Sequence, residues 1–223
     1  MKISVVGLGT ECNQITLRGL QEVQSADAVV LKTAKTQTAK TLQQLNIPFV
    51  SCDSLYDEAQ DFCVLDQKIF DLLKSLQGKV VFCVNGSGTD DSTVQYLLGK
   101  CQVEIFAGVS AAQSILKFSP QSKYQFFCAM DLVETETLSI NLPLAVTETD
   151  DKFLASEVKA KLAKFYDDED EILFYDGKQA ISVFLYQLDM QKKYDEKTCI
   201  IVRPKNLCEK RSFEVSDLKN ILT

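Results

Sequence analysis

The first half of the chain alternates short β-rich runs with segments whose apolar residues recur at helical spacing. Strands that alternate with helices predict a mostly parallel sheet that is covered by helices on both faces. The predicted strands are Ile3–Val6, Ala28–Leu31, Lys79–Val84 and Val103–Phe106. The predicted helices carry Ile15 to Val23, Thr36–Leu45, Phe62 to Leu76, Ser92–Leu98 and a short segment that ends near Phe118.

The second half has a different pattern. Leu142–Val146 predicts a strand and Phe153–Phe165 a helix, after which three strand-like runs follow one another. Consecutive strands predict a mixed sheet with antiparallel pairs. These runs are Ile172–Tyr175, Ile181–Tyr186 and Thr198–Val202. We therefore expect an α/β fold of two lobes that together form one domain, with a parallel-sheet lobe over residues 1–118 and a mixed-sheet lobe over residues 119–223.

Charge and composition exclude several classes of protein. The 223 residues include 24 basic and 31 acidic side chains, a formal net charge of −7, whereas a general nucleic-acid binder needs a dominant basic field. The sequence contains no histidine, which excludes Ser-His-Asp and Cys-His catalysis and zinc bound by histidine. The longest apolar runs fall far short of the roughly 20 residues of a membrane-spanning helix. We expect neither a nucleic-acid partner nor a membrane partner.

The eight cysteines are expected to be reduced and to serve mostly as small buried apolar residues. No two of them form a C-x-x-C pair, so the sequence offers no local zinc or redox motif. Cys83 and Cys199 lie in or directly beside predicted strands. The N-terminal residues have the pattern of a first strand rather than of a signal peptide. These features favour a cytoplasmic protein without a metal site.

Three turns that follow predicted strands are rich in small residues: Gly7-Leu8-Gly9, Asn85–Thr89 and Ala107–Ala111. In an open α/β sheet, ligands bind beyond the carboxyl ends of the strands, and small residues let a ligand approach the backbone. The alternative is that each glycine only makes a tight turn. The G-x-G-x-x-G dinucleotide motif is excluded because its sixth position is Cys12, and no P-loop string occurs.

The order of these motifs resembles the tetrapyrrole methylase superfamily, whose members use S-adenosyl-L-methionine. That superfamily opens with a strand and G-x-G-P-G-D, which corresponds here to Gly7-Leu8-Gly9-Thr10-Glu11-Cys12, and continues with S-A-D-x-V, which is matched from Ser25 to Val29. Its P-G-[VI]-S-[SA] turn corresponds to Ala107-Gly108-Val109-Ser110-Ala111. The resemblance covers nearly the whole chain, from Ile3 to Pro204.

Within that superfamily, the chain is most similar to the methylase-like N-terminal module of YabN, which is fused there to a MazG pyrophosphohydrolase. The matching segments include Leu31–Lys35, Pro48–Phe62, Leu142–Thr147, Ala155–Lys159, Leu185–Asp189 and Thr198–Pro204. No E-x-x-E pair of a MazG domain occurs, and the E-x-x-D strings at Glu148–Asp151 and Glu214–Asp217 are interpreted as chance. The resemblance implies a homodimer, and either a small-molecule methyl acceptor or a MazG-type protein as partner.

The resemblance also implies the residues that would contact the donor: Leu8, Gly9, Gly86, Ser87, Gly88, Ser110, Ala111 and Thr147. The chain departs from the consensus at each donor turn, because Thr10-Glu11-Cys12 replaces P-G-D, Gly86-Ser87-Gly88 replaces G-D-P, and Ala107 replaces a proline. Two functions therefore stay open. One is a methyltransferase, and the other is a catalytically silent module that senses the cofactor or docks a MazG-type protein.

The loop Asn85–Asp91 is expected to decide whether the donor binds. Its Ser87 and Thr89 hydroxyls are candidates to replace the polar contacts of the missing aspartate. Asp90 and Asp91 offer a carboxylate to a ribose or, alternatively, cap the helix that begins at Ser92.

Few cations are available near the predicted strand ends. The one basic cluster there consists of Lys32, Lys35 and Lys40, with Arg18 nearby, and its alternative interpretation is a solvated helix face. An early polycarboxylated tetrapyrrole would need several cations around it. We therefore expect a different acceptor.

Overall fold

The computed structural model describes residues 2–120, 123–195 and 197–205. The chain forms two compact units, Met1–Ser114 and Ile115–Thr223, whereas the boundary predicted from the sequence follows Phe118. Cys208 and the E-x-x-D string at 214–217 lie outside the described residues. Within the described part of the chain, no helix combines the length and the apolar character that crossing a membrane requires.

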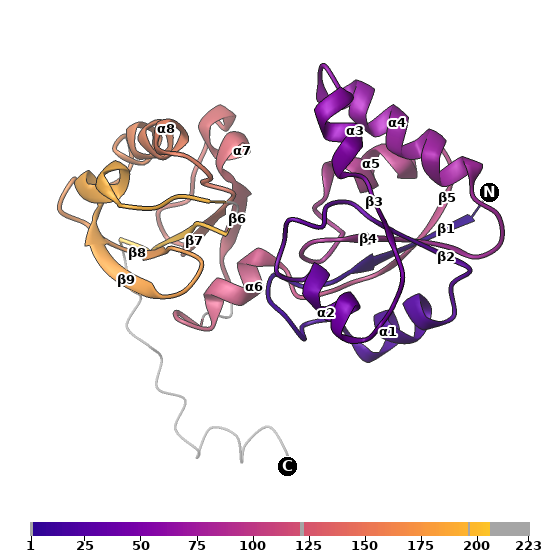
Figure 1. Ribbon diagram of the computed structural model, residues 1–223. Coiled ribbons are helices and arrows are strands. Elements are labelled where there is room, and N and C mark those ends of the chain that lie inside the picture. The colour runs from indigo at the N-terminus through magenta and orange to yellow at the C-terminus, as the bar shows by residue number, and fades with distance from the viewer. Residues whose placement is uncertain (1, 121–122, 196, 206–223) are drawn as a thin grey trace, which may run out of the picture. The chain divides into compact units, whose positions relative to one another are not determined.

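The first unit is built on a five-stranded, fully parallel sheet with the strand order β3-β2-β4-β1-β5 (Figure 1). The strands are β1 (Lys2–Gly7), β2 (Ala28–Leu31), β3 (Val50–Ser51), β4 (Val80–Val84) and β5 (Gln102–Phe106). Because β4, β1 and β5 are neighbours, the turns that follow these three strands emerge side by side at the carboxyl edge of the sheet.

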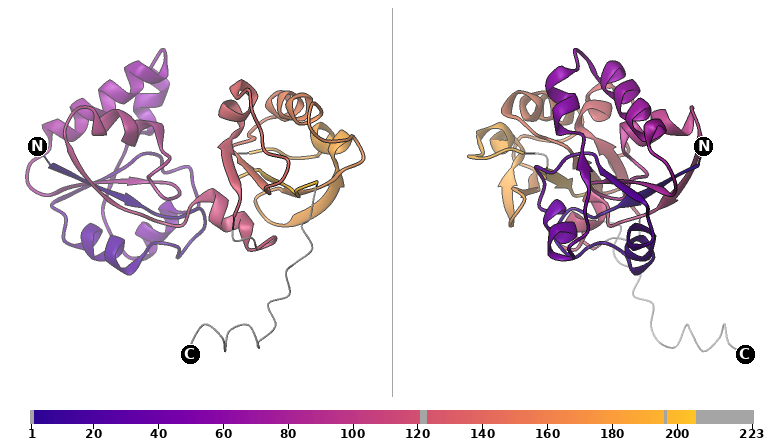
Figure 2. Two further views of the ribbon diagram at one scale, coloured as in Figure 1. Left: turned by 180° about the vertical axis from the view of Figure 1, so that it is seen from behind. Right: turned by 45° about the vertical axis from the view of Figure 1, so that its right-hand side comes forward.

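Helices cover both faces of this sheet, as the views in Figures 1 and 2 show. Side chains alternate along each strand, so Phe82 packs into the core beneath α4 and α5, whereas Val81 and Cys83 face α1 and α2. Burial raises the pKa of the Cys83 thiol to about 12, as expected for an inert core cysteine. The helices are α1 (Leu17–Gln24), α2 (Ala39–Gln44), α3 (Asp53–Glu58), α4 (Phe62–Ser75) and α5 (Ser92–Leu98).

The second unit is built on a mixed sheet with the strand order β6-β7-β10-β8-β9. β6 pairs with β7 in parallel, and the other neighbours are antiparallel. The helices α7, α8 and η1 pack on one face of the sheet around Phe174 and Leu162. The elements are α6 (Ala111–Leu116), which spans the division between the units, then β6 (Gln125–Cys128), α7 (Ala129–Glu134), β7 (Leu144–Thr147), α8 (Lys152–Leu162), β8 (Glu171–Tyr175), β9 (Ala180–Phe184), η1 (Leu185–Met190) and β10 (Cys199–Val202).

The predicted fold class is confirmed: one sheet is parallel and the other is mixed. One strand boundary of the prediction is wrong, and four short elements were not predicted. The strand predicted over Ile181–Tyr186 ends at Phe184, and the next residues form a 3₁₀ helix because Leu185 and Leu188, three residues apart, are both fully buried. The short elements β3, α3, β6 and α7 were not predicted from the sequence.

Candidate functional site

The three small-residue turns meet at the carboxyl edge of the first sheet. Gly9 and Gly86 exchange two backbone hydrogen bonds: the Gly9 N–H donates to the Gly86 carbonyl at 3.0 Å, and the Gly86 N–H donates to the Gly9 carbonyl at 2.8 Å. The Gly108 N–H donates to the Ser87 carbonyl at 3.3 Å. The turns after β1, β4 and β5 therefore form one backbone cluster, which we call the turn cluster (residues 7–10, 85–90 and 107–110).

Gly7 and Gly108 of the turn cluster are required by packing of backbone on backbone, and Gly88 is required by close side chains. A Cβ atom on Gly7 would lie 2.5 Å from the Ser87 carbonyl oxygen, and one on Gly108 would lie 2.5 Å from the Gly7 carbonyl oxygen. On Gly88 it would meet Val84 Cγ2 at 3.1 Å. For these positions the structure gives the glycine a role that needs no ligand.

Gly86 is different. It adopts a left-handed conformation with a φ of 73°, and a Cβ atom built on it has no atom within 4 Å outside its chain neighbours. Its Cα therefore faces open space, although its own two backbone groups are bonded to Gly9. Among the predicted site residues of the turn cluster, Gly86 is the position where a ligand would find room against the backbone.

The first turn is filled by a side chain of the protein itself. Gln14 Oε1 accepts hydrogen bonds from the Thr10 N–H at 2.8 Å and the Glu11 N–H at 3.1 Å, and from the Thr10 hydroxyl at 3.2 Å. A Cβ atom on Gly9 would lie 2.8 Å from the same oxygen. Leu8, also predicted to contact the donor, is buried with 1% of its surface exposed. Gln14 was not among the residues predicted from the sequence. The one feature that could have indicated its role is its position four residues after Thr10, within reach of the turn.

The hydroxyl groups of the second turn form hydrogen bonds within the turn itself. The Ser87 hydroxyl lies 2.6 Å from Asp90 Oδ1 and 2.7 Å from the Thr89 hydroxyl, and it accepts the Thr89 N–H at 3.2 Å. Only 5% of Ser87 is exposed. Asp91 caps α5, because its Oδ1 accepts the Val94 N–H at 3.1 Å, which confirms the capping interpretation for this residue.

The remaining predicted residues lie in two different units. The Ser110 hydroxyl accepts the Gln113 N–H at 3.1 Å, and the Ser110 N–H donates to Gln113 Oε1, so Ser110 orders the start of α6, whose first residue is Ala111. Thr147 belongs to the second unit, where it ends β7 and is buried. The structure thus brings seven of the eight predicted residues together in the first unit: Leu8, Gly9, Gly86, Ser87, Gly88, Ser110 and Ala111.

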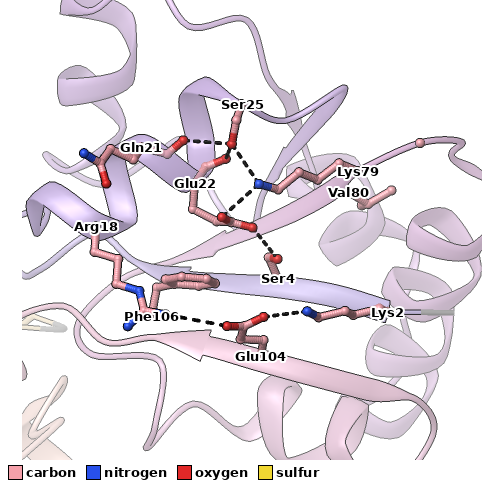
Figure 3. Close-up of a pocket in the computed structure, with 11 residues that line it drawn as sticks. Lys2, Ser4, Arg18, Gln21, Glu22, Ser25, Lys79, Val80, Glu104 and Phe106 are labelled. Carbon is pink, nitrogen blue, oxygen red and sulfur yellow. Dashed lines mark hydrogen bonds and ion pairs between the residues drawn. The ribbon is translucent and has the colours of Figure 1, made fainter.

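A polar hollow of about 850 Å³ lies elsewhere in the first unit, between α1 and the sheet (Figure 3). Its charged groups pair with one another: Lys2 with Glu104 at 2.6 Å, and Lys79 with Glu22 at 2.8 Å. Burial would raise the pKa of Glu22, but hydrogen bonds from Lys79 and Ser4 hold it below its ordinary value. None of the predicted donor residues lines this hollow. Its ion pairs have a structural explanation, which is that they stabilise the sheet and the packing of α1 on it.

The cysteine and carboxylate side chains of the described residues are not clustered as metal ligands. Across residues 2–120, 123–195 and 197–205, no group of three or more cysteine or carboxylate side chains is placed to hold a metal ion. Lys32, the first residue of the predicted basic cluster, forms an ion pair with Asp91 at 2.8 Å. Arg18 stacks on the Phe106 ring, with its guanidinium carbon 5.2 Å from the ring centre.

Solved structures share this two-sheet fold. The chain is similar to a uroporphyrin-III C-methyl transferase from Thermus thermophilus solved with S-adenyl homocysteine, with a TM-score of 0.65 and 14% identity over 91% of this chain and 97% of that one. It is also similar to a precorrin-6Y methylase from Archaeoglobus fulgidus (TM-score 0.64, 13% identity, 92% and 98% covered) and to a diphthine synthase (TM-score 0.64, 13% identity, 92% and 91% covered). At this identity the likeness concerns the fold alone.

The sequence itself matches a family model. No curated protein sequence matches the chain. The model of the tetrapyrrole (corrin/porphyrin) methylases, however, matches residues 2–203, which is most of the chain. The chain therefore belongs to the tetrapyrrole (corrin/porphyrin) methylase family.

Proposed function

We propose that this protein binds S-adenosyl-L-methionine at the turn cluster and transfers its methyl group to a small-molecule acceptor. The observation that carries the proposal is the open side of Gly86, at the point where three turns meet beyond the carboxyl ends of β4, β1 and β5. A solved structure of the same fold is described in complex with S-adenyl homocysteine, which supports the same class of ligand here.

The chemistry of methyl transfer suits a site without histidine. The sulfonium donor carries its own leaving group, so the protein has to align donor and acceptor and to exclude water. Backbone groups and small side chains are sufficient for that task. In our proposal, Gly86 and the adjoining backbone of Ser87 and Gly88 receive the donor, and Ser110 and Ala111 of the same unit complete its surroundings.

The second candidate is a module that binds the donor, or docks a MazG-type protein, without catalysis. The observation that favours it is that polar groups of the turns are hydrogen-bonded within the protein. Gln14 accepts hydrogen bonds from the first turn, and the Ser87 hydroxyl is hydrogen-bonded to Asp90 and Thr89. Fewer free polar groups remain there to orient a reacting donor. In that case the protein transfers no methyl group, and a module that only docks a partner need not bind the cofactor.

The test is calorimetry with S-adenosylhomocysteine on the wild type and two glycine variants. We expect one-to-one binding by the wild type. Gly86→Ala should weaken it about tenfold or more, because a methyl group that overlaps a bound ligand costs about 1–3 kcal/mol. Gly99→Ala is the matched control: Gly99 is exposed at the end of α5 with a φ of −77°. A wild type that does not bind rules the donor proposal out, and binding without transfer of a labelled methyl group selects the silent module.

For the acceptor, we propose a molecule with few carboxylates. Lys32 is already neutralised by Asp91, and Arg18 is held over Phe106, so two members of the basic cluster are engaged. Lys35 and Lys40 are exposed and remain as its other members. Methylation of uroporphyrinogen at an ordinary enzymatic rate would contradict this part of the proposal.

We also propose that the protein is a homodimer. Phe184, the last residue of the edge strand β9, and Tyr186 of η1 are exposed, and their rings stack with centres 5.8 Å apart. Exposed aromatic side chains are typical of protein interfaces. Light scattering that gives a monomer mass at high concentration would reject the dimer.

A further inference from the structure

Lys32 contacts both ends of the second turn. It directly follows β2, and its backbone N–H donates to the Cys83 carbonyl at 2.9 Å, next to the end of β4. Its side-chain Nζ lies 2.8 Å from Asp91 Oδ2, where α5 begins. The loop Asn85–Asp90 lies between these two points. One residue thus connects the strand that enters the loop with the helix that leaves it.

The ion pair is shielded from water, and every oxygen of its carboxylate has a donor. The side chains of Lys32 and Asp91 are 18% and 12% exposed. Asp91 uses Oδ2 for Lys32 and Oδ1 for the Val94 N–H, so the same carboxylate holds the lysine and caps α5. Charges in such surroundings interact more strongly than on an open surface, and removing one leaves the other unpaired.

One neighbour supports the same picture. The Thr38 hydroxyl, from the chain segment that follows Lys32, donates to Asn85 Oδ1 at 3.2 Å and so holds the first residue of the loop. The loop is therefore anchored from the β2 side at its beginning and at its end.

We propose that Lys32 is a positioning residue for the donor site. Through its ion pair with Asp91, Lys32 holds the Asn85–Asp90 loop in place. The inference rests on the proposed function for its ligand, but the geometry concerns the free protein as well. Without the ion pair, the loop keeps its covalent ends and loses the contact that fixes the start of α5 relative to β2. The backbone around Gly86 would then sample conformations that do not receive the donor.

The experiment compares Lys32→Met with Lys159→Met. The control ion pair, Lys159–Asp189 in the second unit, has a similar length of 2.6 Å and similar exposure, 26% and 17%. Two quantities are measured: the Kd for S-adenosylhomocysteine, and hydrogen exchange of the Gly86 and Thr89 amides in the free protein, both of which are hydrogen-bonded. For Lys32→Met we expect both to rise about tenfold, and for Lys159→Met to change less than about twofold, because the local opening is confined to the loop.

Two further variants distinguish the effect of the Lys32–Asp91 charge pair from the effect of Asp91 as the cap of α5. Asp91→Asn keeps a side chain that caps α5 but removes the charge, so it should resemble Lys32→Met. Lys32→Arg keeps the charge and should restore most of the wild-type exchange rate.

The outcomes separate the two proposals. A wild type that does not bind S-adenosylhomocysteine refutes the proposed function, and the exchange rates then decide the role of Lys32 alone. Unchanged exchange at Gly86 and Thr89 in Lys32→Met overturns the inference. Equal effects of Lys32→Met and Lys159→Met on these amides also overturn it, because they would reflect general destabilisation.

Discussion

Gly7 and Gly86 lie in facing turns of the same cluster, and the reasons for the two glycines are opposite. The space where a side chain would begin on Gly7 is filled by the carbonyl groups of Gly86 and Ser87 and by the Gly108 N–H. The corresponding space on Gly86 is empty. A glycine at the carboxyl edge of this parallel sheet therefore has one of two surroundings: close contact between turns, as at Gly7, or the empty space that we propose as the ligand site at Gly86. Only the surroundings distinguish them.

The largest effect is expected where the glycine is enclosed. Gly108→Ala would place a methyl carbon 2.5 Å from the Gly7 carbonyl oxygen and 2.6 Å from that of Gly86, and backbone cannot move aside as a flexible side chain does. We expect a loss of about 3 kcal/mol or more in the free energy of unfolding. Urea unfolding measures it, with Gly99→Ala as control. Equal urea midpoints for Gly108→Ala and Gly99→Ala would contradict the conclusion that the glycines between the turns are enclosed.

A smaller loss is expected from Gln14→Ala, which empties the first turn. The Thr10 and Glu11 N–H groups and the Thr10 hydroxyl lose their shared acceptor, for a cost of about 2 kcal/mol. Affinity for S-adenosylhomocysteine should change less than about threefold, since the open space lies at Gly86 and not at this turn. Gln14→Glu keeps an acceptor and serves as the control. A large gain in affinity for Gln14→Ala would show that the first turn is a donor contact that Gln14 obstructs.

Gly86→Ala should cost less stability than either change above. No atom obstructs the new methyl group, so the cost is that of a left-handed alanine, about 1 kcal/mol. Gly86→Val would cost more, because a β-branched residue tolerates this φ poorly. Thermal unfolding of the three glycine variants should therefore rank Gly108→Ala well below Gly86→Ala, with Gly99→Ala nearest to the wild type. The reverse order for the first two would mean that Gly86 is the enclosed position.

The smallest effect is expected outside the turn cluster, in the polar hollow. Glu22→Gln removes the ion pair with Lys79 and should cost about 0.5 kcal/mol at neutral pH, because this pair is partly exposed. The folded pKa of Glu22 is lowered, so its contribution is complete above the ordinary value of 4.5 and disappears as the pH falls through the lower folded pKa.

Urea unfolding at neutral and at acid pH checks this, and the difference between wild type and Glu22→Gln should shrink in acid. Affinity for S-adenosylhomocysteine should be unchanged at neutral pH. A loss of affinity in Glu22→Gln would connect the hollow with the proposed donor site and would contradict the expected difference between the two regions.

Four of the five strands of the first sheet could be predicted from the sequence because each carries a short run rich in apolar and β-branched residues, whereas β3, which has two residues, was not predicted. Val80–Val84 is buried at every position, and its length and flanking turn are visible in the sequence. β6 and α7 were not predictable in the same way, because they have four and six residues and no sustained periodicity. The 3₁₀ helix at Leu185 begins with residues of strand character, and only burial against α8 distinguishes it.

The site was predictable in location but not in detail. Turns after β1, β4 and β5 were expected at one edge, yet the adjacency of these three strands depends on long-range packing. The Gln14 side chain accepts a hydrogen bond from the Thr10 N–H, and no local sequence pattern predicts this contact. Gly7 and Gly86 are identical letters in the sequence, and their different surroundings arise only once the turns have met.

The bridge between Gly9 and Gly86 has a consequence for chain synthesis. The two residues stand far apart in the sequence, and Gly108, which completes the turn cluster, comes later still. A nascent chain that has only reached α4 contains the first turn without its partner. Contacts at long sequence separation form late, because ordering the intervening chain is costly. The proposed donor site is therefore complete only after β4 and β5 have both joined β1, and ligand capture by a growing polypeptide would report that this step is complete.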